Sequence, residues 1–164
     1  MLGTDIPTWF GILSGALVVS SALSAGLFLT FSDFLMRSFQ LSEDRAGVEV
    51  MQVLNREIFR SLTIVLLFGN IPVSAFLAVY AYVEGFYPLA HFLGAGAVSY
   101  FFGVLIVSYV VNVPMNETLD PMDRASEKTT AYWRESYVAR WVHWNWVRAL
   151  AAITTSVCFL VGLT

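Results

Sequence analysis

Four long apolar runs alternate with two polar segments along this chain. The apolar runs extend over residues 9–34, 59–83, 89–111 and 141–163, and a helix needs about 20 apolar residues to cross a bilayer. Only residues 84–88 separate the second run from the third, so these two helices are expected to form a tight hairpin. The pattern predicts an all-α fold, an integral-membrane antiparallel four-helix bundle in which residues 1–164 form one domain.

The first apolar run has an alternative interpretation as a cleaved signal peptide. The stretch SALSAG at residues 21–26 imitates a cleavage site. A signal peptide also carries basic residues ahead of its apolar region, and no Lys or Arg precedes this one. We therefore interpret residues 9–34 as a retained membrane helix.

Composition favours a membrane protein over a soluble one. Hydrophobic residues make up 57% of the chain and charged residues only 13%, whereas soluble domains typically carry about 25% charged residues. The net charge of −3 gives no reason to expect nucleic acid as a partner. The single cysteine, Cys158, excludes an internal disulfide and a cysteine-based metal site. The lipid bilayer is therefore the expected partner.

The basic residues all fall in the two polar segments or at their edges. They are Arg37, Arg45, Arg56, Arg60, Arg124, Lys128, Arg134, Arg140 and Arg148. Cytoplasmic loops of membrane proteins are enriched in basic residues. We therefore expect this side to face the cytoplasm across the inner or plasma membrane, and both termini to face outward.

Unusual polar residues gather at the same cytoplasmic mouth of the predicted bundle. Asp33 ends the first helix, Asn55 opens the second, Asn116 closes the third and Tyr137 precedes the fourth. Polar groups near membrane spans are costly, so each invites a functional hypothesis. A structural role is the alternative for each one, because asparagines near helix ends also cap helices or join them.

The helical periodicity of YVARWVHWNWVRAL, residues 137–150, predicts on which face of the helix each polar residue lies. At 3.6 residues per turn, Trp141, Asn145 and Arg148 share one face, whereas His143 points almost oppositely. Arg148 lies inside the predicted membrane helix. Its charge therefore needs to snorkel back to water or to meet an anion within the bundle, for which Asp33 is the candidate.

Metal and haem sites can be tested by the same placement. His91 starts the third helix on the outer side, and His143 starts the fourth on the cytoplasmic side, about 30 Å away across the membrane. The two histidines cannot ligate one haem within a monomer. No cluster of His, Cys and carboxylate residues has metal-ligand spacing, so no metal site is expected. Asp33 with Glu57 or Asp120 could hold a hard cation, but their spacing does not require one.

Several stretches resemble one known family. FSDFLM, VMQVLNREIF, VNVPMNETLD and YWRESYVARWVHWNWVRAL together resemble the anthrone-oxygenase-like family of small four-helix membrane proteins. The likeness covers nearly the whole chain, and its specific part is the ordered set of Asn55, the NVPMN box, Trp141, Asn145 and Arg148. One departure is Arg37, at a position where relatives often carry proline.

The resemblance implies a cofactor-independent monooxygenase that acts on phenolic or polycyclic aromatic substrates. An anthrone has an acidic methylene between two aromatic rings, and removal of a proton gives an enolate that reacts directly with O2. No metal or flavin is then obligatory. Such an enzyme needs a base, a group that holds the oxyanion and a dry aromatic slot.

On this resemblance, each residue of the polar mouth has an expected role. Asp33 would be the base, with His143 second, and Arg148 with Asn145 and Asn116 would hold the oxyanion. The expected catalytic residues are Asp33, Asn145 and Arg148, and the expected substrate-binding residues are Asn55, Asn116, Tyr137 and Trp141. The implied ligand is a small hydrophobic aromatic molecule.

A different function class stays open beside this one. The chain could be a non-catalytic membrane module that binds a lipid or a quinone, or an accessory subunit of a larger membrane complex. The polar mouth would then join the helices, and Arg148 would pair with Asp33 or a lipid phosphate. A homo-oligomer or a larger membrane complex is an expected form of such a module.

Overall fold

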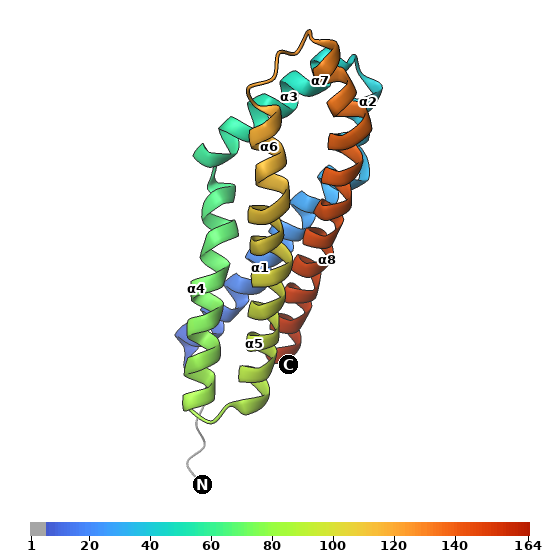
Figure 1. Cartoon of the computed structure of the whole chain (residues 1–164). Coiled ribbons are helices and arrows are strands. Elements are labelled where there is room, and N and C mark those ends of the chain that lie inside the picture. Colours follow the sequence, from blue (N-terminus) through green and yellow to red (C-terminus); the bar gives the residue numbers. More distant parts are fainter. Residues whose placement is uncertain (1–5) are drawn as a thin grey trace.

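The computed structural model describes residues 6–164 and shows an elongated helical bundle (Figure 1). Four helical spans are long and apolar enough to cross a membrane: Thr8–Leu41, Leu62–Val83, Tyr87–Leu119 and Glu127–Gly162. Successive spans run in opposite directions, so the start of α1, the α4–α5 turn and the end of α8 lie at one end of the bundle. The predicted all-α membrane bundle is confirmed.

Most of the spans combine α-helix with π-helical segments. The first comprises α1 (Thr8–Thr30), η1 (Phe31–Leu35) and α2 (Met36–Leu41), and the second is α4 (Leu62–Val83). The third comprises α5 (Tyr87–Tyr100), η3 (Phe101–Ile106), η4 (Ser108–Asn112) and α6 (Val113–Leu119). The fourth comprises α7 (Glu127–Tyr132), η5 (Trp133–Tyr137) and α8 (Val138–Gly162). Between α2 and α4 lie α3 (Asp44–Glu57) and the short 3₁₀-helix η2 (Ile58–Arg60).

Three of these spans continue as helix well beyond their apolar runs. They contain 33 to 36 residues, or about 50 Å at 1.5 Å per residue, whereas the hydrocarbon core of a bilayer is about 30 Å thick. The extra turns project at the end of the bundle that carries α2, α3 and α7, which we call the α3 end (Figure 1). Much of the two polar segments is therefore helical.

Helix α3 crosses the α3 end because one of its faces is apolar. Gly47, Val48, Met51 and Gln52 are buried on this face, whereas Glu49 on the opposite side is exposed. Gly47 permits a close crossing, since a Cβ there would lie 2.6 Å from the backbone oxygen of Phe39 and 3.1 Å from the Trp133 ring.

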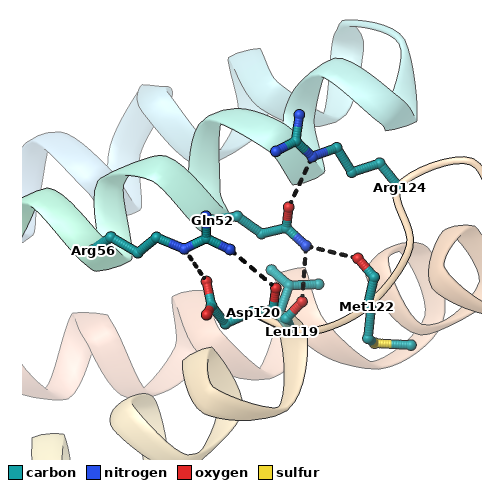
Figure 2. Close-up of polar contacts among 6 residues, drawn as sticks. All are labelled: Gln52, Arg56, Leu119, Asp120, Met122 and Arg124. Atoms are coloured by element: carbon teal, nitrogen blue, oxygen red, sulfur yellow. Dashed lines mark hydrogen bonds and ion pairs between the residues drawn. The ribbon is translucent and has the colours of Figure 1, made fainter.

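A set of polar contacts fixes α3 to the end of α6 and to the loop that follows (Figure 2). The amide of the buried Gln52 donates to the backbone oxygens of Leu119, at 3.0 Å, and Met122, at 2.9 Å. Its oxygen accepts from Arg124 Nε at 3.0 Å, and Arg56 Nε donates to Asp120 Oδ1 at 2.8 Å. These contacts satisfy carbonyls at a helix C-terminus, which would otherwise lack partners.

Small residues in α5 and η3 bring the third span close to α8. A Cβ at Gly103 would overlap that of Ala151, and a Cβ at Gly96 would overlap the Phe159 ring. At the other end of the third span, the turn between α4 and α5 contains Gly85 with φ 83°, a conformation that favours glycine. The short turn confirms the predicted tight hairpin of the second and third spans.

Candidate functional site

A partly open cavity of about 470 Å³ lies among the four spans, and residues of α3 and η2 line it at the α3 end. Its walls are mostly apolar, with Phe28 and Phe31 from the first span, Phe59 and Phe68 near α4, and Trp141 from α8. The polar residues that line it are Asn55, Arg56, Ser108, Asn116, Glu117, Asp120, Asn145 and Arg148. A few polar groups in a mostly apolar pocket are typical of a small-molecule site.

Arg148 places an unpaired positive charge in this apolar wall. Its side chain is buried, with 8% of the residue exposed, and no salt bridge within residues 6–164 involves it. One terminal nitrogen donates to Ser108 Oγ at 3.2 Å and the other to Asn145 Oδ1, while Nε is buried without a partner. The guanidinium carbon also lies 4.6 Å from the Phe28 ring centre and 5.2 Å from that of Trp141.

Asn145 holds this guanidinium in place. It is fully buried, and its amide nitrogen donates to the backbone oxygen of Phe28 and to Ser32 Oγ, both at 2.7 Å. Its oxygen accepts from Arg148. Both ends of the amide are therefore engaged by protein groups, so Asn145 orients Arg148 and is not free to hold an oxyanion as expected.

Asn116 turns a hydrogen-bond donor away from α8. Its side-chain oxygen accepts from the Tyr137 hydroxyl at 2.7 Å and from Trp141 Nε1 at 3.0 Å. An indole N–H can only donate, which fixes the amide with its oxygen toward α8. Since Asn116 lines the cavity, its NH2 group is a second donor there beside Arg148. Tyr137 is fully buried, and it supports Asn116 from behind the cavity wall.

Asn55 brings a further donor from α3. It lines the cavity, and its side-chain nitrogen is buried without a hydrogen-bond partner in the described residues. The cavity wall thus carries N–H groups from three different helices: Arg148 of α8, Asn116 of α6 and Asn55 of α3. Fixed donors in a dry site are suited to an oxygen on which negative charge develops.

A comparison with known protein families finds a match for this chain. The anthrone oxygenase family model matches residues 57–158. This chain belongs to the anthrone oxygenase family. The matched range includes Asn116, Tyr137, Trp141, Asn145 and Arg148, whereas Asn55 lies just before it. No curated protein and no solved structure matches the chain.

Asp33 does not lie where the sequence of this anthrone oxygenase family member suggested. Its side chain is exposed and does not line the cavity, and the expected ion pair with Arg148 is not formed. The inward positions of the first span are Phe28 and Ser32, which meet Asn145. Asp33 follows Ser32, and one residue turns a side chain about 100° around a helix. His143, the second candidate base, is also exposed.

Sequence reasoning missed Glu117 as a residue of the cavity in this family member. Val113, Asn116, Glu117 and Asp120 all line it, and their spacing of three, four and seven residues defines one face of α6. This spacing was visible in VPMNETLD, but the third helix was expected to end near residue 111. Pro114 falls at the start of α6, where its missing N–H is tolerated, and the helix continues.

The described residues hold no preformed metal cluster. Within residues 6–164, no group of three or more His, Cys, Asp and Glu side chains is placed to hold a metal ion. Of the two carboxylates at the cavity, Asp120 is paired with Arg56 at 2.8 Å. The polar chemistry of the site is therefore that of amide and guanidinium donors with one further carboxylate, Glu117.

Proposed function

We propose that this member of the anthrone oxygenase family binds phenolic polycyclic aromatic molecules of the anthrone type and oxygenates them within the membrane. The observation that supports this most is the guanidinium of Arg148, buried in an aromatic cavity without a carboxylate partner among residues 6–164. A buried cation of this kind is costly unless an anion joins it. A phenolate or enolate oxygen is such an anion.

The size and lining of the cavity suit an aromatic ligand. Its volume of about 470 Å³ lies within the usual range of small-molecule pockets, roughly 300–1,000 Å³. Phe28 and Trp141 flank the guanidinium, and Phe31 lies beside Trp141 with ring centres 5.9 Å apart. Aromatic rings of a ligand can stack or meet edge to face with these side chains.

The donors suit the charge that develops during reaction. Loss of a methylene proton from an anthrone moves negative charge to the carbonyl oxygen, where Arg148 would stabilise it; Asn116 and Asn55 are further donors on the cavity wall. Their placement before reaction avoids reorganisation when the charge appears. The enolate then reacts with O2, and the balance is one methylene and one O2 giving one carbonyl and one water.

We further propose that the α3 end faces the cytoplasm. The Lys and Arg residues lie in this end or near it, and basic residues mark the cytoplasmic side of membrane proteins. The apolar middle of the bundle then lies in the lipid, and a hydrophobic substrate reaches the cavity from the membrane or from its surface.

Oxygen uptake by the purified protein tests the oxygenase proposal. The protein in lipid nanodiscs is mixed with a dihydroxyanthrone, and O2 consumption and anthraquinone formation are followed against empty nanodiscs. We expect catalysed conversion with one O2 per anthrone, and its loss in Arg148→Lys, because Lys lacks the planar fork of Arg. Saturable binding without faster conversion would instead favour a non-catalytic module that binds a quinone or lipid headgroup.

A further inference from the structure

Glu117 is the carboxylate of the cavity that no other side chain neutralises. It lines the cavity from α6, next to Asn116, and no hydrogen bond or salt bridge within residues 6–164 involves its side chain. The other lining carboxylate, Asp120, is occupied by Arg56 Nε at 2.8 Å. Glu117 is also exposed, which keeps it in contact with solvent protons at the rim of the cavity.

The directions of α6 and α8 favour a tilt of the Glu117 and Arg148 side chains toward one another along the bundle axis. Side chains on a helix tilt toward its N-terminus, and α6 and α8 run in opposite directions (Figure 1). The contacts of Arg148 with Asn145 and Trp141, which precede it in α8, show this tilt. Arg148 also touches Ser108, and Glu117 lies nine residues after Ser108, about 13 Å along the helix at 1.5 Å per residue.

This arrangement matches the chemistry of an anthrone. Its carbonyl carbon and its methylene occupy opposite positions of the central ring, so an oxygen held by Arg148 directs the methylene toward the other end of the cavity. We propose that Glu117 is the catalytic base that takes the methylene proton. The inference rests on the oxygenase function proposed above and adds to it the residue that activates the substrate.

The proposed steps balance in atoms and charge. The Glu117 carboxylate takes one methylene proton, and the electron pair of the C–H bond moves to the oxygen held by Arg148. The enolate carbon adds O2, and the resulting peroxide anion takes the proton back from Glu117. Glu117 then removes the second proton from the same carbon as the O–O bond breaks. Hydroxide leaves and becomes water with that proton, so the carbon is oxidised to a carbonyl and O2 is reduced.

Hydrogen exchange without oxygen isolates the first of these steps. Under nitrogen, a dihydroxyanthrone is incubated in D2O with the protein in nanodiscs, and deuterium at its methylene is measured by mass spectrometry. We expect the wild type to accelerate exchange over empty nanodiscs. Glu117→Gln should lower the catalysed exchange by about 100-fold or more, since general bases contribute roughly 10²–10⁴. Glu117→Asp should restore part of it.

Two controls distinguish loss of the base from loss of folding or of ligand binding. Asp33→Asn, which removes the exposed carboxylate favoured by the sequence, should exchange like the wild type. Glu117→Gln should still bind the dihydroxyanthrone in a fluorescence titration, because Arg148 holds its oxygen. Wild-type exchange in Glu117→Gln, or loss of its binding together with exchange, would overturn the assignment of the base.

Failure of the base assignment is distinguishable from failure of the proposed function. If Arg148→Lys loses binding and turnover while Glu117→Gln exchanges normally, the oxygenase function stands and the base is another group. If the wild type neither binds the dihydroxyanthrone nor accelerates exchange or O2 uptake, the proposed function fails, and the role of Glu117 fails with it.

Discussion

Replacing Arg148 by Met separates the stability of the bundle from ligand binding. Met fills a similar space with an unbranched apolar side chain, so it removes the buried cation and little else. We expect Arg148→Met to fold and to insert into the membrane, and to lose its affinity for a phenolate ligand. A structural arginine would give the reverse result, with a damaged bundle.

The expected magnitudes follow from the contacts of Arg148. An Arg at the centre of a membrane helix costs about 2.5–3.5 kcal/mol on insertion scales, and Met avoids this cost. Against this, Asn145 Oδ1 loses its hydrogen-bond partner, a loss of about 1–3 kcal/mol. The contacts with the Phe28 and Trp141 rings add about 0.5–2 kcal/mol. Ser108 keeps its bond to the Val104 oxygen at 2.6 Å. The free energy of unfolding should therefore stay within about 2.5 kcal/mol of the wild type.

Ligand binding should change much more. Loss of one partner of a buried hydrogen-bonded charge pair costs about 2–5 kcal/mol, or roughly 30-fold to several thousand-fold in Kd. Fluorescence titration with a dihydroxyanthrone measures affinity, and unfolding in a denaturing detergent measures stability. Arg140→Met is the matched control, since Arg140 lies on the same helix but is exposed. Unchanged affinity in Arg148→Met would refute the role of this cation in binding. A variant that is already unfolded before the denaturing detergent is added would also refute it, because the arginine would then be structural.

Three further predictions test the support around the site. Asn145→Ala removes three hydrogen bonds and should lower the free energy of unfolding by about 2–4 kcal/mol; equal stability in the detergent titration would contradict its supporting role. Gln52→Leu keeps the side-chain volume but removes the hydrogen bonds that fix α3, so limited proteolysis within residues 42–61 should become faster. An unchanged rate of cleavage would contradict the role of Gln52 in holding α3. In a chain without its native cysteine, Glu84→Cys should react with an impermeant thiol reagent on intact cells and Ser126→Cys should not; labelling of Ser126→Cys would invert the proposed orientation.

Hydropathy and charge along the chain determined the membrane bundle. Each span is apolar enough to be recognised alone, because lipid surrounds it and exposed side chains such as Val65 and Val79 must be apolar as well. The sequence also predicted which residues of α8 face the interior of the bundle. Trp141, Asn145 and Arg148 face the interior and His143 is exposed, because α8 is regular α-helix from Val138 onward.

The extent of the helices needed tertiary structure. Polar segments were expected to begin where apolar runs ended, yet α6 continues to Leu119 and brings Glu117 to the cavity. Helix outside the membrane depends on packing of one face rather than on a continuous apolar run. The apolar face of α3 and the contacts of Gln52 supply that packing here.

Which polar groups meet one another was also decided only by the folded chain. Opposite charge suggested that Asp33 pairs with Arg148, but Ser32 occupies the inward position and Asn145 binds the guanidinium instead. A single residue separates Ser32, which is buried against Asn145, from the exposed Asp33, and the π-helical turn at Phe31–Leu35 lies at this point of the first span. Sequence alone therefore identified Arg148 and the asparagines of the site in this anthrone oxygenase family member, whereas their partners and the role of the carboxylates depend on helix rotation and contact between spans.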